Sequence, residues 1–512
     1  MDSVYQPILA TDLIIRALGH TRDRAAIVMN DGTTVTAGDL AKAISRNAQA
    51  FAALSPRPAR AALLSRNRSE VPSIINAFSF AGIVSTALHP MGSVEDYLYV
   101  IEDAAIDLLV YDASYAGRIA EIRQRSTRIR HYVVIGEDGD VPSLLAIAAD
   151  FAPQELVSPA VDANAAARIA YSGGTTGKPK GILVTHRALV TSTMLQMSEW
   201  QWPEEIRFLI CAPLSHAGAA ALTTVLLKSG TLYVLDRFDP VQFMEMVQRH
   251  RITATLMVPT MVLALIDHPR LREFDLSSLE SIFYGASPFP AARLRDAIGA
   301  LGPVFFQFYG QAEAPLSIMV LRKEEHLCDD PVRMASCGRP TSQVHVSLLD
   351  DDEQPVADGQ PGEICVRGPL VMAGYLNKPE ETQAALKGGW LHTGDVGIRS
   401  PDGFYRIVDR KKEMIITGGF NVFAREVEDV LCRQPGVRQA AVFGLPDPKW
   451  GEVVTAVIVA DRPGSLSSAD LISAVRMEKG VVQAPKAVHF VDEIPVTPLG
   501  KPDKKKLKDL FA

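Results

Sequence analysis

The sequence lacks the features of an exported, disulfide-bonded or zinc-binding protein. The N-terminal segment carries Asp2 and Asp12 where a signal peptide has positive charge, and no small-residue cleavage site follows an apolar run. The cysteines are odd in number, scattered and without a CxxC pair: Cys211, Cys328, Cys337, Cys365 and Cys432. We therefore expect a cytoplasmic protein with neither a disulfide framework nor a zinc site.

The sequence also lacks an excess of positive charge and a long, uninterrupted apolar segment. A net charge of −7 and a pI near 5.9 argue against a nucleic-acid partner. The short basic cluster at residues 504–508 is interpreted as a solvated helix face. Two uncharged runs, 71–88 and 209–227, each contain Pro, Gly and several Ser or Thr. They predict a buried helix and strand rather than a transmembrane segment.

The remaining pattern predicts a wound α/β fold of at least two domains. A chain of 512 residues exceeds one ordinary core. Residues 39–54 carry Leu40, Ile44, Ala48 and Phe51 at helical spacing, which indicates an amphipathic helix. Short apolar or β-branched runs alternate with helical stretches at 61–64, 108–111, 131–135 and 231–235.

Two changes in composition divide the C-terminal part of the chain. Residues 348–365 are acidic and rich in turn residues between strand-like pairs, which predicts a β-rich subdomain. Residues 409–413 are five consecutive charges between expected strands at 404–408 and 414–417, so we expect an exposed connector. We predict a large domain over 1–408, a hinge over 409–412 and a small, mobile α+β domain over 413–512.

The segment 171–181, YSGGTTGKPKG, is the clearest functional signal. Four glycines, two threonines and two lysines describe a backbone that can aim N–H groups and hydroxyls at a phosphate, with lysine as the counter-charge. It is not a Walker loop, because Pro179 follows Lys178 and Ser172 stands where that loop needs glycine. A flexible surface linker is the alternative, but the flanking apolar residues 182–184 favour strands that anchor the loop.

Three further motifs place polar residues beside expected strands. YGQAE, residues 309–313, follows the strand-like run 304–308 and offers Glu313 as an oxygen ligand for magnesium. GWLHTGDVG, residues 389–397, places Asp395 in a turn as an acceptor for ribose hydroxyls. FYGAS, residues 283–287, also follows a strand-like segment. Taken alone, these motifs could be a surface turn and an Asx turn.

Together with TPLGK at residues 497–501, these motifs resemble, in order, the signatures of the acyl-adenylate-forming (AMP-binding) superfamily. That family holds acyl-CoA synthetases, luciferases and peptide-synthetase adenylation domains. Gly173 stands where the family usually has serine, and Ala312 where it usually has threonine. Pro502 replaces a more usual β-branched residue after the closing lysine.

The resemblance implies a role for each motif. Lys501, Glu313 and Thr176 are the catalytic candidates, Glu313 also as the Mg²⁺ ligand, and Lys412 is the hinge residue. The implied CoA route passes Gly418, Gly419 and Phe420. The implied ATP and AMP contacts are Ser172, Gly173, Gly174, Thr175, Thr176, Gly177, Lys178, Lys180, Gly285, Ala286, Ser287, Tyr309, Gly310, Gln311, Ala312, Asp395, Arg410 and Lys501.

The implied reaction joins a carboxylic acid to coenzyme A through an acyl-adenylate, with ATP as co-substrate. The run 212–227, APLSHAGAAALTTVLL, resembles the wall of the family's acyl pocket and contains no charged residue. An ammonium or a second carboxylate would find no partner there, so an apolar fatty or aryl monocarboxylate is favoured. The implied acyl-pocket residues are His216, Ala219, Ala220, Tyr284, Gly285 and Tyr309.

Three other functions share these signals. An acyl-AMP ligase that loads a carrier protein would carry every motif, and a luciferase-like oxygenase would use the same adenylate. A non-enzymatic ATP-sensing module would bind nucleotide without releasing pyrophosphate, but Lys501 and Glu313 argue against it. A homodimer is possible.

Overall fold

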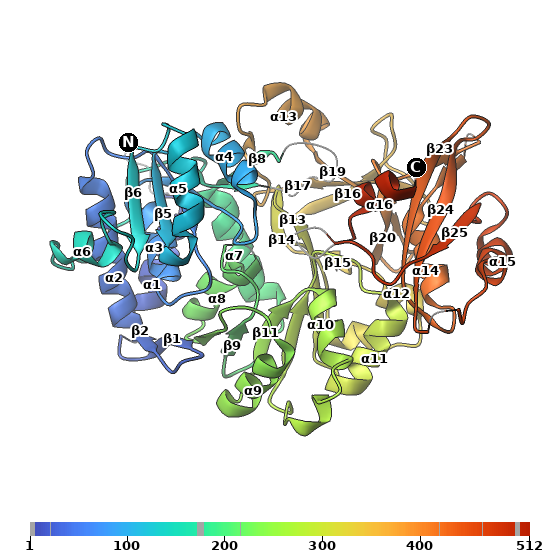
Figure 1. Ribbon diagram of the computed structural model, residues 1–512, viewed down its shortest axis with the longest axis horizontal. Coiled ribbons are helices and arrows are strands. Elements are labelled where there is room, and N and C mark those ends of the chain that lie inside the picture. The colour runs from blue at the N-terminus through green and yellow to red at the C-terminus, as the bar shows by residue number, and fades with distance from the viewer. Residues whose placement is uncertain are drawn as a thin grey trace.

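The computed structural model describes residues 6–20, 22–171, 179–215, 217–418, 420–462, 464–496 and 502–511. Within these ranges, the strands form two mostly parallel sheets and two mostly antiparallel sheets. Figure 1 shows them following one another from the blue N-terminal strands on the left to the red C-terminal strands on the right. The predicted α/β class with a large N-terminal and a small C-terminal part is confirmed.

The two mostly parallel sheets come from the N-terminal part of the chain. The larger sheet has the strand order β15 (Arg339–Pro340), β14 (Ala314–Leu321), β13 (Phe305–Gln311), β12 (Ser281–Tyr284), β11 (Ala254–Met257), β9 (Arg207–Ile210), β10 (Thr231–Val234), β1 (Ala25–Met29) and β2 (Thr34–Thr36). The other has the order β18 (Gly374–Tyr375), β8 (Gly181–Thr185), β7 (Ala166–Tyr171), β4 (Val84–Ala87), β3 (Arg60–Leu64), β5 (Leu108–Asp112) and β6 (His131–Ile135).

The two mostly antiparallel sheets follow in the sequence. One has the order β16 (His345–Leu349), β17 (Pro361–Arg367), β19 (Leu391–Arg399) and β20 (Tyr405–Arg410), which confirms the β-rich subdomain. The C-terminal sheet has the order β22 (Phe420–Val422), β21 (Ile415–Thr417), β24 (Gly451–Ala460) and β23 (Val437–Asp447), with β25 (Ala487–Phe490) paired in parallel to β24.

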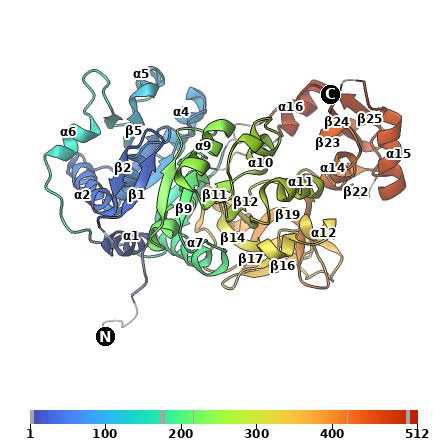
Figure 2. The same cartoon turned by 90° about the horizontal axis from the view of Figure 1, so that it is seen from below.

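Helices cover these sheets (Figures 1 and 2). In chain order they are α1 (Ala10–Gly19), α2 (Ala37–Ala53), α3 (Val71–Phe80), α4 (Val94–Asp103), α5 (Ala116–Arg125), α6 (Leu144–Ala149), α7 (His186–Glu199), α8 (Leu222–Leu227), α9 (Pro240–His250), α10 (Pro259–Ile266), α11 (Ala291–Leu301), α12 (Pro331–Met334), α13 (Pro379–Ala385), α14 (Ala424–Cys432), α15 (Ser468–Lys479) and α16 (Lys504–Phe511).

The predicted amphipathic helix is α2, and its sequence explains both its start and its buried face. The Thr36 side chain accepts the Asp39 N–H at 3.1 Å, which caps the first turn. Leu40, Ile44 and Phe51 are buried on the face that packs against α3. The periodicity of the apolar residues thus placed this helix correctly.

The uncharged runs 71–88 and 209–227 fold as predicted. The first forms α3 and β4, and the second contains the end of β9 and all of α8. None of the helices in the described part of the chain combines the length and the hydrophobicity that crossing a bilayer requires.

Three sheets share one core beneath the motifs of interest. This core joins Ile182 of β8, Tyr309 of β13, Ile364 of β17, Leu391 of β19 and Tyr405 of β20. The strands that carry the functional candidates are therefore packed against one another, and their side chains have fixed relative positions.

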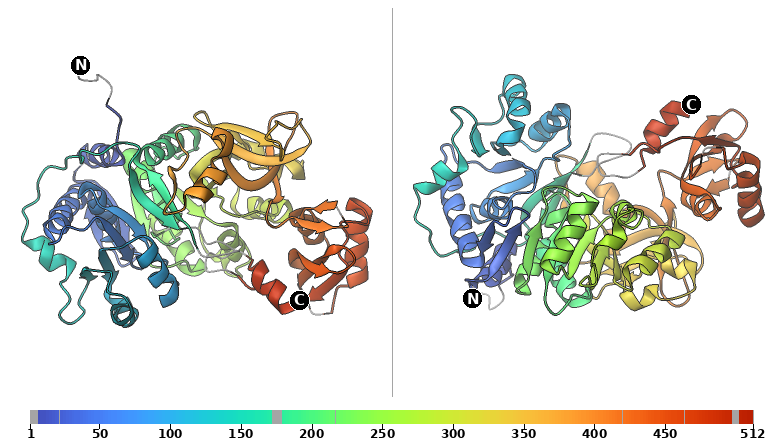
Figure 3. Two further views of the ribbon diagram at one scale, coloured as in Figure 1. Left: turned by 90° about the horizontal axis from the view of Figure 1, so that it is seen from above. Right: turned by 60° about the horizontal axis from the view of Figure 1, so that its bottom comes forward.

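The C-terminal part has a core of its own. Val427, Val430 and Leu431 of α14 are buried against the C-terminal sheet, as their helical spacing predicts. Figure 3 shows this red part beside the rest of the molecule in both views. A separate core is what a domain that folds and moves as a unit requires.

Two expectations about exposed charge are wrong for one residue each, Asp409 in the connector and Lys504 in the basic cluster. Asp409 is 4% exposed, because β20 continues through Asp409 to Arg410 and the Asp409 carboxylate accepts the Ala424 N–H at 2.5 Å. Lys504 begins α16, yet its side chain is only 18% exposed and pairs with Glu428 at 2.9 Å. Charge runs predict exposure on average, but a carboxylate with a donor and a lysine with a carboxylate can be buried.

Candidate active site

Three site candidates meet where β13 packs against the β19–β20 pair of the neighbouring sheet. Tyr309 donates its phenol O–H to Asp395 Oδ2 at 2.7 Å, and Arg410 Nε lies 3.1 Å from Asp395 Oδ1. Asp395 and Arg410 face each other across the β19–β20 pair. The charge of Asp395 raises the pKa of Arg410. Each carboxylate oxygen keeps a lone pair for a further donor, as two adjacent ribose hydroxyls would require.

The strand ends differ from the sequence prediction around this triad. Tyr309, Gly310 and Gln311 were expected to follow a strand, but β13 runs through Gln311. Asp395 was expected in a turn, but it lies within β19. Both segments carry glycine and polar residues, which the sequence patterns associate with turns.

Asp395 belongs to an irregular segment of β19 rather than to a regular ladder. On β17, Glu363 faces Val396 and Cys365 faces His392, so two residues of β17 span four of β19. Gly394 has φ +73°, a conformation that favours glycine. Thr393 Oγ1 donates to Ile364 O at 2.7 Å and accepts the Asp395 N–H at 3.1 Å. The side chains around this β-bulge therefore fix the direction of Asp395.

Glu313 lies between the ends of β13 and β14, as a magnesium ligand near the nucleotide would. Tyr375 donates its O–H to Glu313 Oε1 at 3.0 Å. Burial raises the pKa of Glu313, because the charged form is poorly solvated there. A bound cation would compensate that charge, and carboxylate oxygens are the ligands that Mg²⁺ prefers, so the donor fits the ion.

Gly285, in the turn after β12, and Gly310, in β13, leave no room for larger side chains. A Cβ on Gly285 would lie 2.4 Å from Phe308 O, and one on Gly310 would lie 2.4 Å from Leu316 N. Ala286 has φ +66°, which is uncommon outside glycine. A strained residue directly after a close backbone approach is typical of a ligand-binding turn.

The uncharged run 212–227 is fixed in place by Asn67, which is 3% exposed. Its side chain donates to Ala212 O at 3.1 Å and accepts the Leu214 N–H at 2.7 Å. Ala219 and Ala220 pack against the core that contains Trp200, Phe283 and Phe308. The segment therefore presents small residues over an aromatic floor.

The residues that flank the phosphate loop form the strands predicted for them. Tyr171 ends β7 and Gly181 begins β8, and these two residues face each other in the antiparallel pair. The Tyr171 O–H donates to Asp103 Oδ2 at 2.7 Å. Lys180 pairs with Glu381, and its ammonium lies 4.8 Å from the centre of the Tyr375 ring.

Several predicted site residues lie outside the described residues. They are Ser172, Gly173, Gly174, Thr175, Thr176, Gly177, Lys178, His216, Gly419 and Lys501. Their roles remain predictions from the sequence. Lys412 is exposed and is the second residue after β20, while Ser287 and Ala312 are half-buried.

The segment predicted to line the CoA route lies next to Trp450. Gly418 donates its N–H to Trp450 O at 2.7 Å, and a Cβ on Gly418 would lie 2.8 Å from the indole ring. Phe420 is 61% exposed and Trp450 is 43% exposed. The ammonium groups of Lys449 and Lys486 lie 5.2 Å and 5.8 Å from the indole centre. Exposed aromatic and cationic groups together suit an anionic nucleotide.

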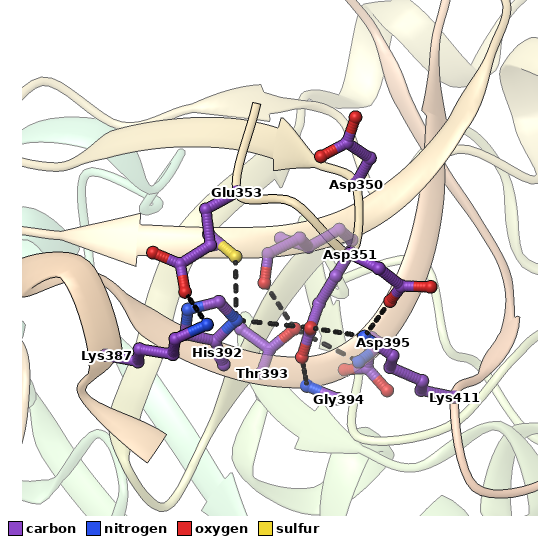
Figure 4. A network of polar contacts seen from close by, with 12 residues as sticks. Asp350, Asp351, Glu353, Lys387, His392, Thr393, Gly394, Asp395 and Lys411 are labelled. Carbon is purple, nitrogen blue, oxygen red and sulfur yellow. Dashed lines mark hydrogen bonds and ion pairs between the residues drawn. The ribbon is translucent and has the colours of Figure 1, made fainter. Parts of the chain in front are cut away.

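A polar network surrounds the segment that carries Asp395 (Figure 4). Glu363, Cys365 and His392 each place one possible ligand atom within 4.8 Å of the others. However, Lys411 Nζ lies 3.3 Å from Glu363 Oε2, and burial raises the pKa of Cys365 to about 12. The lysine already compensates the charge of the carboxylate, and these side chains form a hydrogen-bond network with one another.

Sequence reasoning missed Tyr375, Asn67, Trp450, Glu363 and His392 as parts of the site. Glu363 and His392 stand in the GEIC and WLHTGD stretches, so their position beside recognised motifs could have identified them. Tyr375 and Asn67 carry no local signal, because only the fold brings them to Glu313 and to Ala212.

Comparison with family models gives two matches. Residues 15–376 match the model described as AMP-binding enzyme, and residues 426–501 match the model described as AMP-binding enzyme C-terminal domain.

Individual relatives match over nearly the whole chain. A medium/long-chain-fatty-acid–CoA ligase, FadD8 of Mycobacterium tuberculosis, is 46% identical over 98% of this chain and 89% of its own. A feruloyl-CoA synthase of Amycolatopsis sp is 34% identical over 95% of this chain and 96% of its own. The solved structure of the amide bond synthetase McbA of Marinactinospora thermotolerans is 32% identical, with a TM-score of 0.89 over 98% of this chain and 100% of that one.

Proposed function

The chain belongs to the AMP-binding enzyme family, and from this premise we propose that it joins an apolar monocarboxylic acid to coenzyme A through an acyl-adenylate. The contact of Tyr309, Asp395 and Arg410 beside Glu313 carries the proposal. These side chains would hold the ribose and the metal next to the phosphates, where the family chemistry occurs. Medium- or long-chain fatty acids and aryl acids are the favoured substrates.

The reaction has two steps, and neither needs a protein nucleophile. The acid's carboxylate oxygen attacks the α-phosphorus of ATP, and the bond to pyrophosphate breaks. The CoA thiol sulfur then attacks the acyl carbon, its proton is lost, and AMP leaves. Catalysis is therefore positioning and charge stabilisation by Lys501, Thr175 and Thr176. Mg²⁺, held by Glu313, would supply positive charge beside the phosphates.

Arg410 and Asp395 hold the nucleotide from the strands β19 and β20, and Lys412 follows them as the hinge. Rotation about Lys412 would bring Lys501 to the α-phosphate in the first step. In the second step it would bring the segment 418–420 to the thiol route. Trp450, Lys449 and Lys486 support this assignment, because they offer stacking and positive charge beside Gly418.

The apolar character of the acid follows from the segment 212–227. Ala219 and Ala220 lie over the core of Trp200, Phe283 and Phe308, and the segment carries no charge. A charged group on the acid would lose hydration there without gaining a partner. The relatives' names include both a fatty-acid and an aryl-acid ligase, so a screen across chain lengths and aryl acids decides between them.

The acceptor of the acyl group has alternatives. A carrier-protein thiol would replace free CoA in an acyl-AMP ligase, and an amine would replace it in an enzyme like the amide bond synthetase. Loss of free thiol when ATP, acid and CoA are mixed supports the CoA ligase. The cytoplasmic location and the possible homodimer also remain proposals, the latter open to light scattering after size-exclusion chromatography.

Substitution of Lys501 tests the mechanism. Lys501→Ala removes the charge beside the α-phosphate, so acid-dependent pyrophosphate release should fall about a hundred- to a thousandfold. AMP binding should change little, and chemically supplied acyl-adenylate should still yield acyl-CoA. Lys508→Ala, a lysine of α16, is the control and should keep both steps. Normal adenylation, or equal loss of both steps, in Lys501→Ala would contradict the proposal.

A further inference from the structure

Glu363 lies on β17 beside the irregular part of β19, and its side chain is only 10% exposed. Its Oε1 accepts the Gly394 N–H at 2.9 Å. Its Oε2 lies 3.3 Å from Lys411 Nζ and 3.2 Å from His392 Nδ1. Figure 4 shows His392, Gly394 and Lys411 near Asp395.

These contacts replace backbone hydrogen bonds that the β17–β19 pair lacks at the bulge. The extra residues of β19 move Gly394 away from the backbone acceptors of β17. An unpaired N–H in a half-buried strand would be costly, and the Glu363 carboxylate accepts it instead. The conformation of the bulge therefore depends on a side chain as well as on the backbone.

The contacts also close a ring beside the Asp395–Arg410 pair. Glu363 bonds Gly394, Lys411 donates its backbone N–H to Gly394 O at 2.8 Å, and the Lys411 ammonium returns to Glu363. Gly394 precedes Asp395, and Lys411 follows Arg410. Both members of the pair are thus held by their immediate neighbours.

We propose that Glu363 is a positioning residue for nucleotide binding, which aims Asp395 and Arg410 at the ribose by fixing Gly394 and Lys411. This inference rests on the proposed function. The groups that contact the Glu363 carboxylate come from β19 and from the residue that follows β20. They are the Lys411 ammonium, the His392 ring and the backbone N–H of Gly394, while Asp351 pairs with Lys411 at 2.8 Å from the other side.

Nucleotide discrimination tests the proposal with a readout other than activity. AMP, 2′-deoxy-AMP and 3′-deoxy-AMP are titrated into the full chain by calorimetry. If Asp395 accepts the ribose hydroxyls, the wild type should bind AMP about tenfold more tightly than at least one deoxy analogue, as expected for one charge-assisted hydrogen bond. In Glu363→Gln the amide oxygen can still accept the Gly394 N–H, but the ion pair with Lys411 is lost and the ring opens. The ratio should therefore fall below about threefold, because the misaimed Asp395 carboxylate no longer distinguishes the sugars.

Glu353→Gln is the matched control. Glu353 is a carboxylate of the same subdomain that pairs with Lys387 and does not bond Gly394. Its substitution should leave the AMP to deoxy-AMP ratio at the wild-type value. Figure 4 shows Glu353 with Lys387.

The outcomes separate this inference from the function on which it rests. Weaker binding of all three nucleotides by Glu363→Gln, with an unchanged ratio, would show that Glu363 stabilises the fold without orienting Asp395. That result would overturn the inference. A wild type that binds AMP and discriminates, with a Glu363→Gln variant that does so equally, would overturn it as well. A wild type that binds no AMP would overturn the proposed function and the inference with it. Should Glu363→Gln fail to fold, Lys411→Met opens the same ring and should also narrow the ratio.

Discussion

Tyr309 donates its phenol O–H to Asp395 Oδ2 at 2.7 Å, although the two residues are 86 positions apart in the chain. Both are buried, with exposed fractions of 8% and 5%. Burial and the charge of Asp395 raise the pKa of Tyr309, so the phenol remains a donor at any physiological pH. This bond joins two sequence motifs into one site.

Tyr309→Phe removes this donor and keeps the ring. The carboxylate of Asp395 would lose one of its two fixed partners, so the KM for ATP should rise about tenfold, the value of one hydrogen bond to a charged group. Initial rates of pyrophosphate release against ATP concentration measure this. Tyr233→Phe, on β10, is the control and should not change the KM. An unchanged KM in Tyr309→Phe would show that the bond does not orient Asp395 toward the nucleotide.

The sequence predicted the helices, strands and motifs of this site better than the contacts between them. Alternation of apolar runs and helical stretches placed α2, β3, β5 and β6 correctly, because buried faces impose their periodicity on the sequence. Gly285 and Glu313 follow the ends of β12 and β13 as the sequence predicted. The contacts of Tyr375 with Glu313 and of Glu363 with Gly394 depend on strand register, which no single segment encodes.

The errors have physical causes as well. Asp395 lies within a strand and not in a turn, because side-chain hydrogen bonds replace the regular ladder at the bulge of β19. Tyr309 lies within β13, because its backbone pairs with Met319 of β14. Asp409 is buried in a run of charges, because it accepts the Ala424 N–H. Composition predicts the average environment of a residue type, whereas burial of one charge depends on one partner.

Ala220→Trp tests the acyl pocket. The indole would fill space above the aromatic floor, so the longest accepted acid should become shorter while the KM for ATP stays the same. A series of straight-chain acids in the pyrophosphate assay measures the limit, and Ala220→Ser serves as a small control that should keep it. An unchanged chain-length limit in Ala220→Trp would mean that the segment 212–227 does not line the pocket.

Because His326 is buried, we predict that the free energy of unfolding falls in acid. It is 2% exposed, its Nδ1 lies 2.7 Å from Arg322 O and its Nε2 lies 2.8 Å from the hydroxyl of Tyr284, so the ring is held neutral. Burial lowers the pKa of His326 from 6.5 to about 4. The unfolded chain therefore binds a proton that the folded chain does not, and stability falls as the pH drops from about 6.5 to about 4.

The effect of His326 can be isolated by a difference measurement. The contribution is up to about 3 kcal/mol over that range. Denaturant unfolding of the wild type and of His326→Gln is compared at several pH values, because the carboxylates titrate in both proteins and cancel. The stability advantage of the wild type should shrink steadily below pH ~6. A difference that is constant from pH ~7 to ~4 would show that His326 does not titrate as its burial requires.

Lys504 links the end of the chain to the connector that follows β20. Its Nζ lies 2.9 Å from Glu428 Oε1 of α14 and 3.5 Å from Glu413 Oε2. Burial opposes the charge of Lys504, but the two carboxylates outweigh it and raise the pKa of Lys504. Asp409 lies close enough to interact with this charge, and burial raises the pKa of Asp409 to about 6. One ammonium thus compensates a group of carboxylates around the predicted hinge.

Lys504→Met leaves these carboxylates without their cation. The free energy of unfolding of the C-terminal part should therefore fall by about 2 kcal/mol. This loss is smaller than for a fully buried ion pair, because Lys504 is partly exposed. Lys505→Met is the matched control: it is the next residue of the same helix, it is exposed, and its loss should change stability by less than about 0.5 kcal/mol. Calorimetric unfolding measures both.

Because Lys504 lies three residues after Lys501, Lys504→Met should also slow acid-dependent pyrophosphate release more than it slows thioester formation from supplied acyl-adenylate. Equal stability of the two variants would show that the Lys504 pairs contribute no more than an exposed charge, and equal loss of both half-reactions would show that they do not position Lys501.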